Sequence, residues 1–428
     1  MKPSAQRAPA VVLSGNLGPP SRSINEVALT LTRSLGRQGV RVFRFHPDRS
    51  LVDLNSRYCA HVACPNLYGD AAGLAASLVD FAEKRGERPV VFPASDGAAR
   101  FLAQNEETLK SSCELACPTW SSIAEIQDKQ RLLTRACDAG VPIPVTHFPK
   151  SAAELDTFAA DLPYPVIIKP LMSHEWKRAE VVAAIGSVKA VVVTSPKELA
   201  EVYGKVAPLT SDLMVQEIVP GETERLLTFL GYVGRGGKTL AGCVRRKLRQ
   251  FPPGFGYCCL TETVRDPEIM DLSVRLLEGL GFRGIGGVEF MRDARDGRPK
   301  LIEINARAVR TTGAAVGAGV DLPWIAYRDL TSAEPVRPTF DYAVPFRWIH
   351  LRSEVRAAVA LMRKRELRPL DWLRIFRGKT VMAVWAWDDL RPSVEDLLLP
   401  LTRRIPRLAP KRFRRQTQPV PVHPEATV

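Results

Sequence analysis

The sequence predicts an α/β fold in which an N-terminal βα unit precedes a longer region of mixed strands and helices. Residues 11–117 alternate short apolar runs with amphipathic stretches, which is typical of parallel strands joined by helices. Beyond residue 118, pairs of strands joined by turns lie between helices. The 428 residues are 45% hydrophobic and 25% charged, which indicates roughly two to four globular domains and excludes a wholly disordered, collagen-like or coiled-coil chain.

The first elements are short and bounded by turn residues. An apolar strand is expected over 11–14, a helix over 23–38, and further strands over 40–45 and 90–92. Gly15 and Gly18 after the first strand are typical of a phosphate-binding turn. The third glycine of the dinucleotide fingerprint is missing, however, so an ordinary tight turn is the competing interpretation.

The middle of the chain predicts one helix over 122–139, ended by Gly140 and the prolines that follow it. The remaining expected elements are helices over 151–160, 196–206, 267–280 and 353–365, strands over 165–169, 189–194, 213–218, 284–291 and 300–305, and a hairpin over 226–243. We divide the chain into 1–117, 118–332, 333–400 and a basic tail over 401–428 that we expect to be disordered.

The strongest local pattern is Leu301–Arg307, in which polar and apolar residues alternate. In a strand, this places Glu303, Asn305 and Arg307 on one face and turns Ile302 and Ile304 into a core.

Glu289 lies in a similar apolar setting on the preceding strand, so two antiparallel strands would bring Glu289 and Glu303 together. Two carboxylates and one amide oxygen suit Mg²⁺, with phosphate and water completing the coordination. The competing interpretation is a pair of edge strands with solvated outer faces.

Two lysines and one strand end complete the pattern. Lys169 ends an apolar strand, where its charge needs a partner such as a phosphate, and Lys129 is a second candidate that could equally be a solvated helix lysine. The run Val215–Glu224 leaves a strand for a turn, so backbone groups that do not pair with neighbouring strands can read a base edge.

In this order and spacing, the motifs resemble the ATP-grasp superfamily of carboxylate–amine ligases. The resemblance covers residues 118–332, and the stretch Arg249–Pro253 is similar to the D-aspartate-ligase-like subgroup. It implies a Rossmann-like pre-ATP-grasp domain, a two-lobed α+β ATP-grasp unit and a small C-terminal extension.

The resemblance also implies a role for each motif residue. Lys129 and Lys169 would hold the ATP phosphates, and Glu217, Ile218 and Val219 the adenine. Glu224 would hold the ribose, and Glu289, Glu303 and Asn305 would bind Mg²⁺ or Mn²⁺. Arg307 would stabilise negative charge on the transferred phosphoryl group or the substrate. Arg246 and Arg249 are candidates for binding the carboxylate, with a solvated basic edge as the alternative.

The implied reaction joins a small-molecule carboxylate to an amine, with an amino acid as one partner, through an acyl phosphate and with release of ADP. A covering loop is expected over 171–186, with Trp176 either against the substrate or in the core. The alternatives are a biotin-carboxylase-like enzyme that activates bicarbonate and an ATP-binding scaffold without turnover.

The net charge of +14 is concentrated toward the C-terminus, where residues 401–428 carry seven Lys or Arg and one acid. No nucleic-acid recognition module is recognisable, so no nucleic-acid partner is expected. Attraction of the tail to an anionic surface is a minority alternative. The eight cysteines show no zinc spacing, and no signal peptide or membrane span is apparent, so a cytoplasmic enzyme is expected.

Overall fold

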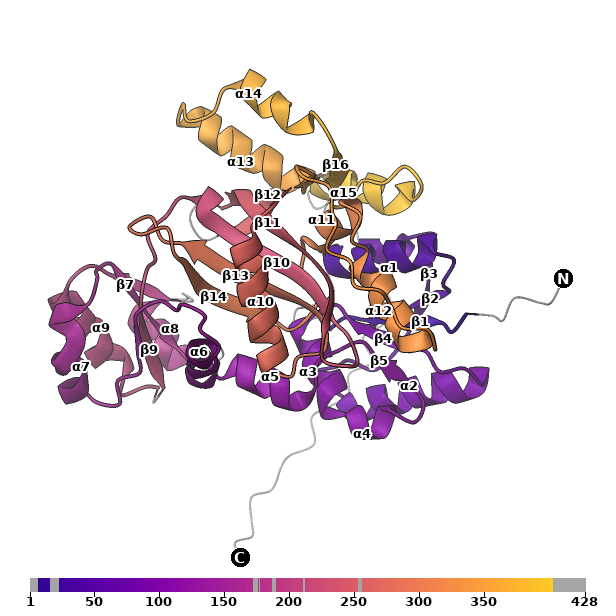
Figure 1. Cartoon of the computed structure of the whole chain (residues 1–428), viewed down its shortest axis with the longest axis horizontal. Helices are drawn as coiled ribbons and strands as arrows, with labels where there is room; N and C mark the ends of the chain where they lie inside the picture. Colours follow the sequence, from indigo (N-terminus) through magenta and orange to yellow (C-terminus); the bar gives the residue numbers. More distant parts are fainter. Residues whose placement is uncertain are drawn as a thin grey trace, which may run out of the picture.

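A computed structural model describes residues 7–15, 23–171, 176, 178–186, 190–210, 212–252 and 256–402, with only the backbone at 399–402. Its strands form three sheets of five, seven and four strands (Figure 1). The predicted α/β class is confirmed. None of the described helices is long and apolar enough to cross a membrane.

The N-terminal sheet is parallel, with the strand order β3-β2-β1-β4-β5. Its strands are β1 (Ala10–Leu13), β2 (Val42–Phe45), β3 (Cys59–Val62), β4 (Val90–Pro93) and β5 (Glu114–Leu115). Helix α1 (Glu26–Arg37) packs on one face, and α2 (Ala71–Arg85) and α3 (Asp96–Gln104) pack on the other. The predicted βα alternation is confirmed, because apolar side chains cover both faces of the sheet.

A four-stranded sheet of order β6-β9-β7-β8 follows. Its strands are β6 (Thr146–His147), β7 (Val166–Pro170), β8 (Val191–Val193) and β9 (Leu213–Glu217). Helices α7 (Ala152–Phe158), α8 (Ala179–Ile185) and α9 (Pro196–Val206) share one apolar core with these strands. This small layer lies apart from the N-terminal sheet in Figure 1.

The largest sheet has the order β14-β13-β10-β11-β12-β15-β16. Its central strands are β10 (Leu226–Val233), β11 (Thr239–Phe251), β12 (Tyr257–Val264), β13 (Gly284–Arg292) and β14 (Pro299–Asn305). Helix α10 (Pro267–Gly279) covers one face, and α12 (Leu322–Thr331) packs with α1 against part of the other. The predicted hairpin is confirmed, and Gly237 takes the positive φ of 73° that its turn requires.

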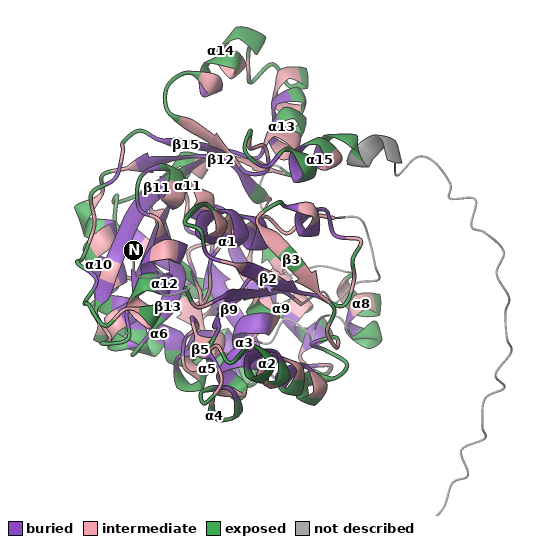
Figure 2. Ribbon diagram, turned by 90° about the vertical axis from the view of Figure 1, so that its right-hand side faces the viewer, coloured by how far each residue is buried: buried purple, intermediate pink, exposed green. Residues whose placement is uncertain are grey.

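The C-terminal segment completes this sheet rather than standing beside it. The short strands β15 (Arg347–Ile349) and β16 (Thr380–Met382) extend the sheet beyond β12. Three-residue strands carry too little periodicity to be predicted from the sequence. Between them lie α13 (Leu351–Arg363), α14 (Pro369–Leu373) and the 3₁₀ turn η5 (Arg374–Phe376), and α15 (Leu390–Thr402) follows β16. Figure 2 shows that α14 is largely exposed, unlike the central strands.

The single helix predicted over 122–139 is wrong. The segment forms two helices, α5 (Trp120–Gln127) and α6 (Lys129–Asp138), which are separated by Asp128. Asp128 has extended backbone angles, and its side chain accepts a hydrogen bond from the backbone N–H of Arg131. Aspartate is a favoured N-cap residue. Asp128 therefore caps a second helix, which begins at Lys129. The tail from 403 onward lies outside the described residues.

Candidate active site

A row of polar side chains crosses one face of the seven-stranded sheet. Thr228 on β10 lies opposite both Arg245 on β11 and Glu289 on β13, and Glu289 lies opposite Glu303 on β14. Directly opposed residues share a face, so these four side chains project from the same side of the sheet. Helix α10 packs on the other side, which leaves this face available to a ligand.

The predicted pairing of Glu289 with Glu303 is therefore present, but the prediction for Ile302 is wrong. A β-bulge lies between the Glu289–Glu303 pair and the Phe290–Leu301 pair, and Ile302 is the extra residue. Ile302 is 38% exposed, whereas Leu301 and Ile304 are buried. Strict alternation cannot describe a strand in which two residues face one partner residue.

The acids of this row form an incomplete set of metal ligands. The Nδ2 atom of Asn305 donates to Oε1 of Glu303 at 2.6 Å, and Thr228 Oγ1 donates to Oε2 of Glu289 at 3.4 Å. Burial, with a contribution from the Glu303 carboxylate, raises the pKa of Glu289 against the opposing effect of Lys247 and Arg245. No cluster of three His, Cys, Asp or Glu ligands occurs among the described residues. Two carboxylates and an amide fit a hard cation that takes its other ligands from phosphate and water.

Two lysines from outside the large sheet approach one of these acids, Glu303. Lys169 near the end of β7 interacts electrostatically with Lys129 at the start of α6, and each interacts with Glu303. Burial and the Lys129 charge lower the pKa of Lys169 to about 8, and burial lowers the pKa of Lys129. Lys169 Nζ donates to Oε1 of Gln216 at 3.4 Å. Two neighbouring, partly buried cations indicate a site that attracts an anion.

Glu217 lies at the end of β9, but its carboxylate is fully engaged by the protein. Its Oε1 accepts from Lys300 at 2.5 Å and from the Val145 N–H at 2.9 Å, and its Oε2 accepts from Arg295 at 2.7 Å. Burial acts to raise the pKa of Glu217, but these donors outweigh burial and lower it. The side chain therefore has a structural role, and the Glu217 N–H donates to the Val145 carbonyl at 2.9 Å. Only the backbone carbonyl of Glu217 is left for a base.

The backbone N–H groups of the two residues after Glu217 differ in whether they have a hydrogen-bond partner. The N–H of Ile218 donates to the carbonyl of Pro165 at 3.1 Å, so it is not free to read a base edge. The N–H of Val219 donates to no partner among the described residues. Glu224 lies in the exposed 3₁₀ turn η4 (Thr223–Arg225), where a carboxylate can meet a hydroxylated ligand.

The basic residues of β11 divide between the two faces of the sheet, which the sequence did not resolve. Arg245 and Lys247 lie on the face of the acids and are only 4% and 7% exposed. Arg245 Nη1 donates to Thr261 Oγ1 at 3.4 Å and to Cys258 Sγ at 3.8 Å, and Lys247 Nζ donates to Gln250 Oε1 at 3.4 Å. Neither has a carboxylate within ion-pair distance among the described residues. We therefore add Arg245 and Lys247 to the candidate site.

Arg246 and Arg249, the residues suggested by the sequence, are both held by acids. Arg246 binds Oε1 of Glu262 through Nε at 2.9 Å and Nη2 at 2.6 Å. Arg249 pairs with the buried Glu354 of α13, so the alternative of a solvated basic edge is wrong for Arg249. A register shift between Lys247 and Arg249 changes the facing pattern along this strand.

Arg307 connects the site to the N-terminal sheet. Its Nε and Nη2 atoms donate to the two carboxylate oxygens of Asp96 at 2.8 and 2.9 Å. Asp96 is the first residue of α3, and the helix is capped by Ser95 instead. The two-point pairing orients the Arg307 guanidinium, whose third nitrogen, Nη1, donates to the carbonyl of Ala308 at 3.0 Å.

The predicted covering segment is described only in part. Trp176 is 3% exposed and belongs to the core of the four-stranded sheet, which decides between its two predicted positions. His174 and Lys177 lie outside the described residues, as does Pro253 of the stretch that carries the subgroup resemblance.

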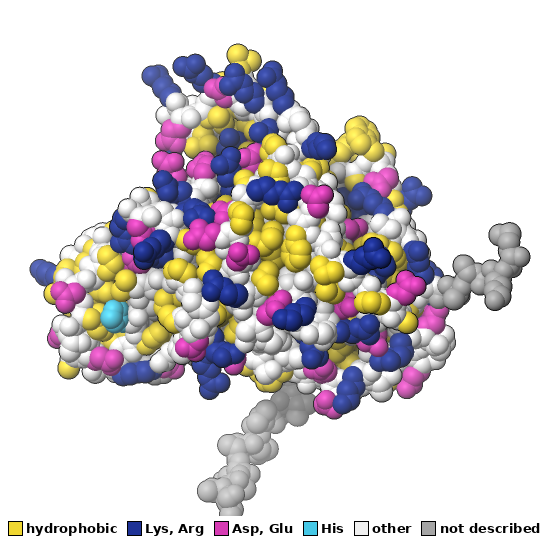
Figure 3. Space-filling view, viewed as in Figure 1, with side chains coloured by type: hydrophobic (Ala, Val, Ile, Leu, Met, Phe, Trp, Pro, Cys, Tyr) yellow, Lys and Arg dark blue, Asp and Glu magenta, His cyan; other side chains and the backbone are white. Residues whose placement is uncertain are grey.

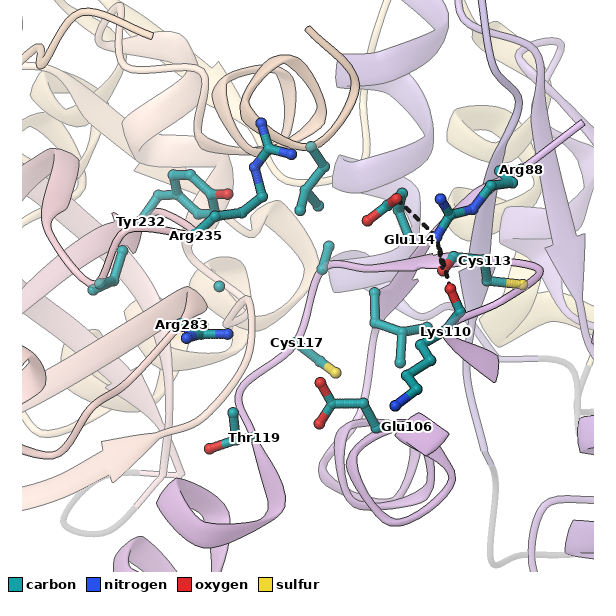
Figure 4. A pocket seen from close by; sticks show the side chains of 15 residues that line it. Arg88, Glu106, Lys110, Cys113, Glu114, Cys117, Thr119, Tyr232, Arg235 and Arg283 are labelled. Carbon is teal, nitrogen blue, oxygen red and sulfur yellow. Dashed lines mark hydrogen bonds and ion pairs between the residues drawn. The ribbon is translucent and has the colours of Figure 1, made fainter. Parts of the chain in front are cut away.

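A separate cavity of about 200 Å³ lies at the N-terminal end of β13, beside Gly284 (Figure 4). Its walls come from β5, the segment that leads into α5, and the starts or ends of β10, β13 and α12. Arg88 and Glu114 form an ion pair at 3.0 Å on one wall. Arg283 stands across the cavity from Glu106 in Figure 4. None of the nucleotide or metal candidates lines this cavity, so it is not part of the candidate active site.

Comparisons with known proteins agree with this geometry. Residues 210–350 match the family described as "ATP-grasp in the biosynthetic pathway with Ter operon". These residues include β10, β11, β13 and β14, which carry the row of acids and cations. The chain carries an ATP-grasp domain.

Relatives extend this similarity along the chain at low sequence identity. A D-aspartate ligase of Enterococcus faecium (strain Aus0004) is 22% identical over 260 residues, 59% of this chain and 61% of that protein. A D-alanine–D-alanine ligase of Pseudomonas fluorescens (strain Pf0-1) is 26% identical over 191 residues, 42% of this chain and 55% of that protein. The matched segments therefore span somewhat more than half the length of these curated relatives.

Among solved structures, the ADP complex of an N5-carboxyaminoimidazole ribonucleotide synthetase, purK, has the same fold. It aligns with a TM-score of 0.60 at 12% identity, covering 85% of this chain and 86% of that chain. The similarity in fold therefore extends well beyond residues 210–350.

Proposed function

We propose that this protein is an ATP-dependent carboxylate–amine ligase that forms an amide and releases ADP and phosphate. The observation that carries the proposal is the approach of Lys129 and Lys169 to Glu303 on β14, which lies opposite Glu289 on β13. Partly buried cations that repel each other, next to two carboxylates that repel each other, suit a triphosphate with its metal ion. A scaffold has no need for such an arrangement.

In this proposal, the nucleotide lies between the four-stranded and seven-stranded sheets. Lys129 and Lys169 bind its phosphates as point charges. The backbone carbonyl of Glu217 and the N–H of Val219 bind adenine, and Glu224 binds the ribose hydroxyls. This assignment uses the backbone of Glu217 because its side chain is already engaged by Lys300 and Arg295.

Glu289, Glu303 and Asn305 would hold Mg²⁺ or Mn²⁺ on the same face. The fit rests on their oxygen-rich donor set and on the raised pKa of Glu289, which a nearby cation would relieve. When bound, the metal neutralises charge on the phosphates during transfer.

The reaction follows from this arrangement of charges. An oxygen of the substrate carboxylate attacks the γ-phosphorus, the bond to ADP breaks, and an acyl phosphate forms. The amine nitrogen then attacks the acyl carbon, phosphate leaves with its electron pair, and the amine loses a proton to solvent. Arg245 and Lys247 stabilise the negative charge that spreads over the transferred group and the acyl oxygen. Arg307 is a weaker candidate for this role, because Asp96 already neutralises it. No protein nucleophile is required.

An amino acid is the proposed partner because the curated relatives are ligases of D-aspartate and of D-alanine. The buried cations on β11 support a substrate that carries a carboxylate beyond the one that reacts. Arg246 and Arg249 are weaker candidates for this role, since Glu262 and Glu354 already neutralise them.

The test is ADP release from Mg-ATP in the presence of a panel of amino acids and small carboxylates. A ligase releases ADP only when both a carboxylate and an amine are present, and Glu303→Gln abolishes this release. Hydroxylamine trapping followed by mass spectrometry identifies the acyl phosphate and therefore the carboxylate.

The same assay separates the two alternatives. ADP release that requires bicarbonate but no amine would indicate the carboxylase-type activity. Binding of ATP without turnover across the whole panel would indicate a scaffold and would overturn the proposal.

A further inference from the structure

The segment from Leu351 to Thr380, which we call the C-terminal projection, contains α13, α14 and η5. Its thirty residues include nine Lys or Arg and three acids, a large part of the net charge of +14. Figure 3 shows Lys and Arg side chains gathered over this part of the molecule, with apolar side chains at its tip. The concentration of positive charge is therefore a property of the folded protein and not only of the tail.

The charges of the projection are mostly free to act on a partner. Eight of the basic side chains are exposed, namely Arg356, Arg363, Lys364, Arg365, Arg368, Arg374, Arg377 and Lys379. Of the acids, Glu354 is buried against Arg249, and Asp371 pairs with Arg374 at 2.7 Å. Only Glu366 is a fully exposed acid in this segment. The surface potential is therefore strongly positive.

Apolar side chains stand among these cations. Leu370 is 77% exposed and Leu373 is 52% exposed, both on the short helix α14. On α13, Val355 and Val359 are 40% and 41% exposed. Packing within the projection does not bury these leucines. Exposure of apolar side chains to water is unfavourable, so these leucines indicate an interaction surface.

A small apolar cluster fixes the tip to the large sheet. The rings of Trp372 and Phe376 pack edge to face with centroids 5.4 Å apart, and Ile375 joins Leu260 and Ile349 of the large sheet. The two leucines are therefore presented on a fixed base that β15 and β16 tie to the sheet.

We propose that the C-terminal projection docks on an anionic phospholipid membrane. Cations attract the lipid headgroups while Leu370 and Leu373 enter the boundary between headgroups and acyl chains. A nucleic acid would use the cations but would leave the leucines in water. An acidic protein partner would need a defined apolar pocket for two side chains at a protruding tip. In Figure 1 the projection lies away from the four-stranded sheet, so docking leaves the nucleotide side accessible.

The test is co-sedimentation of the full-length protein with phosphatidylcholine vesicles that contain or lack phosphatidylglycerol. Binding is expected only with phosphatidylglycerol. The triple variant Arg363→Gln, Lys364→Gln, Arg368→Gln is expected to weaken binding about a hundredfold. The double variant Leu370→Ser, Leu373→Ser is expected to weaken it about tenfold at unchanged charge. All five positions are at the surface, so the fold should tolerate these changes.

Matched controls remove the same chemistry elsewhere. Lys84→Gln, Lys110→Gln, Lys238→Gln removes three charges whose side chains are 71%, 59% and 79% exposed, and Val192→Ser removes an apolar side chain that is 41% exposed. Both controls should bind vesicles within about threefold of the wild type. Deletion of residues 403–428 should leave the effect of the leucine variant intact.

Three results would overturn the proposal. The first is equal binding by the wild type and the leucine variant, since that indicates a purely electrostatic contact. The second is complete loss of binding on tail deletion alone. The third is displacement of the vesicles by duplex DNA together with DNA binding that the leucine variant retains, since that indicates a nucleic-acid surface. None of these readouts depends on the ligase activity.

Discussion

Two buried charged regions of the protein differ in how their charges are neutralised. At Glu217, Lys300 and Arg295 pair with two buried carboxylates, those of Glu217 and Asp293, and the pKa of Glu217 is lowered. At Glu289 and Lys169, the pKa of the acid is raised and the pKa of the lysine is lowered. Glu217 is neutralised within the protein itself, whereas we propose that a ligand supplies counter-charges to the second region.

The type of residue therefore does not distinguish these two regions. They differ in whether each charged group has an oppositely charged partner within the protein. Arg245 and Arg246 make the same point as neighbours on one strand. Arg246 has a carboxylate partner in Glu262, and Arg245 has only the neutral groups of Thr261 and Cys258. We expect the unneutralised member of each comparison to control activity and the neutralised member to control stability.

The largest expected effect concerns the acids of the unneutralised region. Glu303→Gln keeps the shape of the side chain but removes the charge that faces Lys129, Lys169 and the proposed metal ion. We expect a loss of about a thousandfold in the rate of ADP release. Steady-state assays with Mg-ATP measure this effect, and the melting temperature should stay near that of the wild type. Activity within tenfold of the wild type would contradict the assignment.

The next effect separates the two neighbouring arginines. Arg245→Gln is expected to lower kcat/KM about a hundredfold, because a buried donor to the developing charge is lost. Arg246→Gln removes an ion pair whose arginine side chain is 45% exposed, and it should change kcat/KM by less than about threefold. The ratio of the two losses is the measurement. Equal losses would mean that the two faces of β11 do not differ in function.

Glu217→Gln tests the neutralised region. The change leaves Asp293 as the one remaining carboxylate partner of Lys300 and Arg295 among the described residues, in a site where the Glu217 carboxylate is 1% exposed. We expect the free energy of unfolding to fall by about 3 kcal/mol in urea titrations. Glu222→Gln, an exposed acid at the adjoining turn, serves as the control and should be neutral. A KM for ATP that rises sharply without loss of stability would show that the carboxylate binds the nucleotide directly.

The smallest expected effect is a pH dependence set by Lys169, whose pKa is about 8. The ammonium is charged below this pKa and neutral above it, so ATP affinity should fall as pH rises from 7 to 9, by about tenfold at most. Because the pKa is lower in the folded than in the unfolded state, the charged lysine also costs stability below pH 8. Lys169→Met should therefore raise the melting temperature of the nucleotide-free protein at pH 7.

Lys169→Arg provides the control for this pH profile. Arginine remains charged across the whole range, so the fall in ATP affinity between pH 7 and 9 should disappear. Nucleotide binding measured by isothermal calorimetry gives both curves. An unchanged pH profile in Lys169→Arg would assign the titration to another group.

The proposed membrane surface adds a contrast between two apolar regions. From the sequence, Trp176 could lie against the substrate or in the core, and it is buried in the core. Leu370 and Leu373 are apolar residues of α14, and they are exposed. Sequence hydrophobicity alone does not distinguish these cases, because burial depends on which elements pack against each residue.

Much of the local structure could be predicted from residues that are close together in the chain. The periodicity of apolar residues, the glycines of the 226–243 hairpin and the prolines around Pro142 specify most of the helices and strands. The alternating acids at Glu289 and Glu303 predicted the strand pair that carries them. These features depend on residues close together in the chain, where steric preference and side-chain alternation act directly.

Which charged side chains pair with each other depends on contacts between segments that are far apart in the sequence. Glu217 is neutralised by residues 78 and 83 positions away, and Arg307 is oriented by an aspartate 211 positions away. The bulge at Ile302 and the register shift before Arg249 depend on the partner strands. Long-range pairing fixes these contacts, since the desolvation of a charge depends on everything that surrounds it and not on its neighbours in sequence.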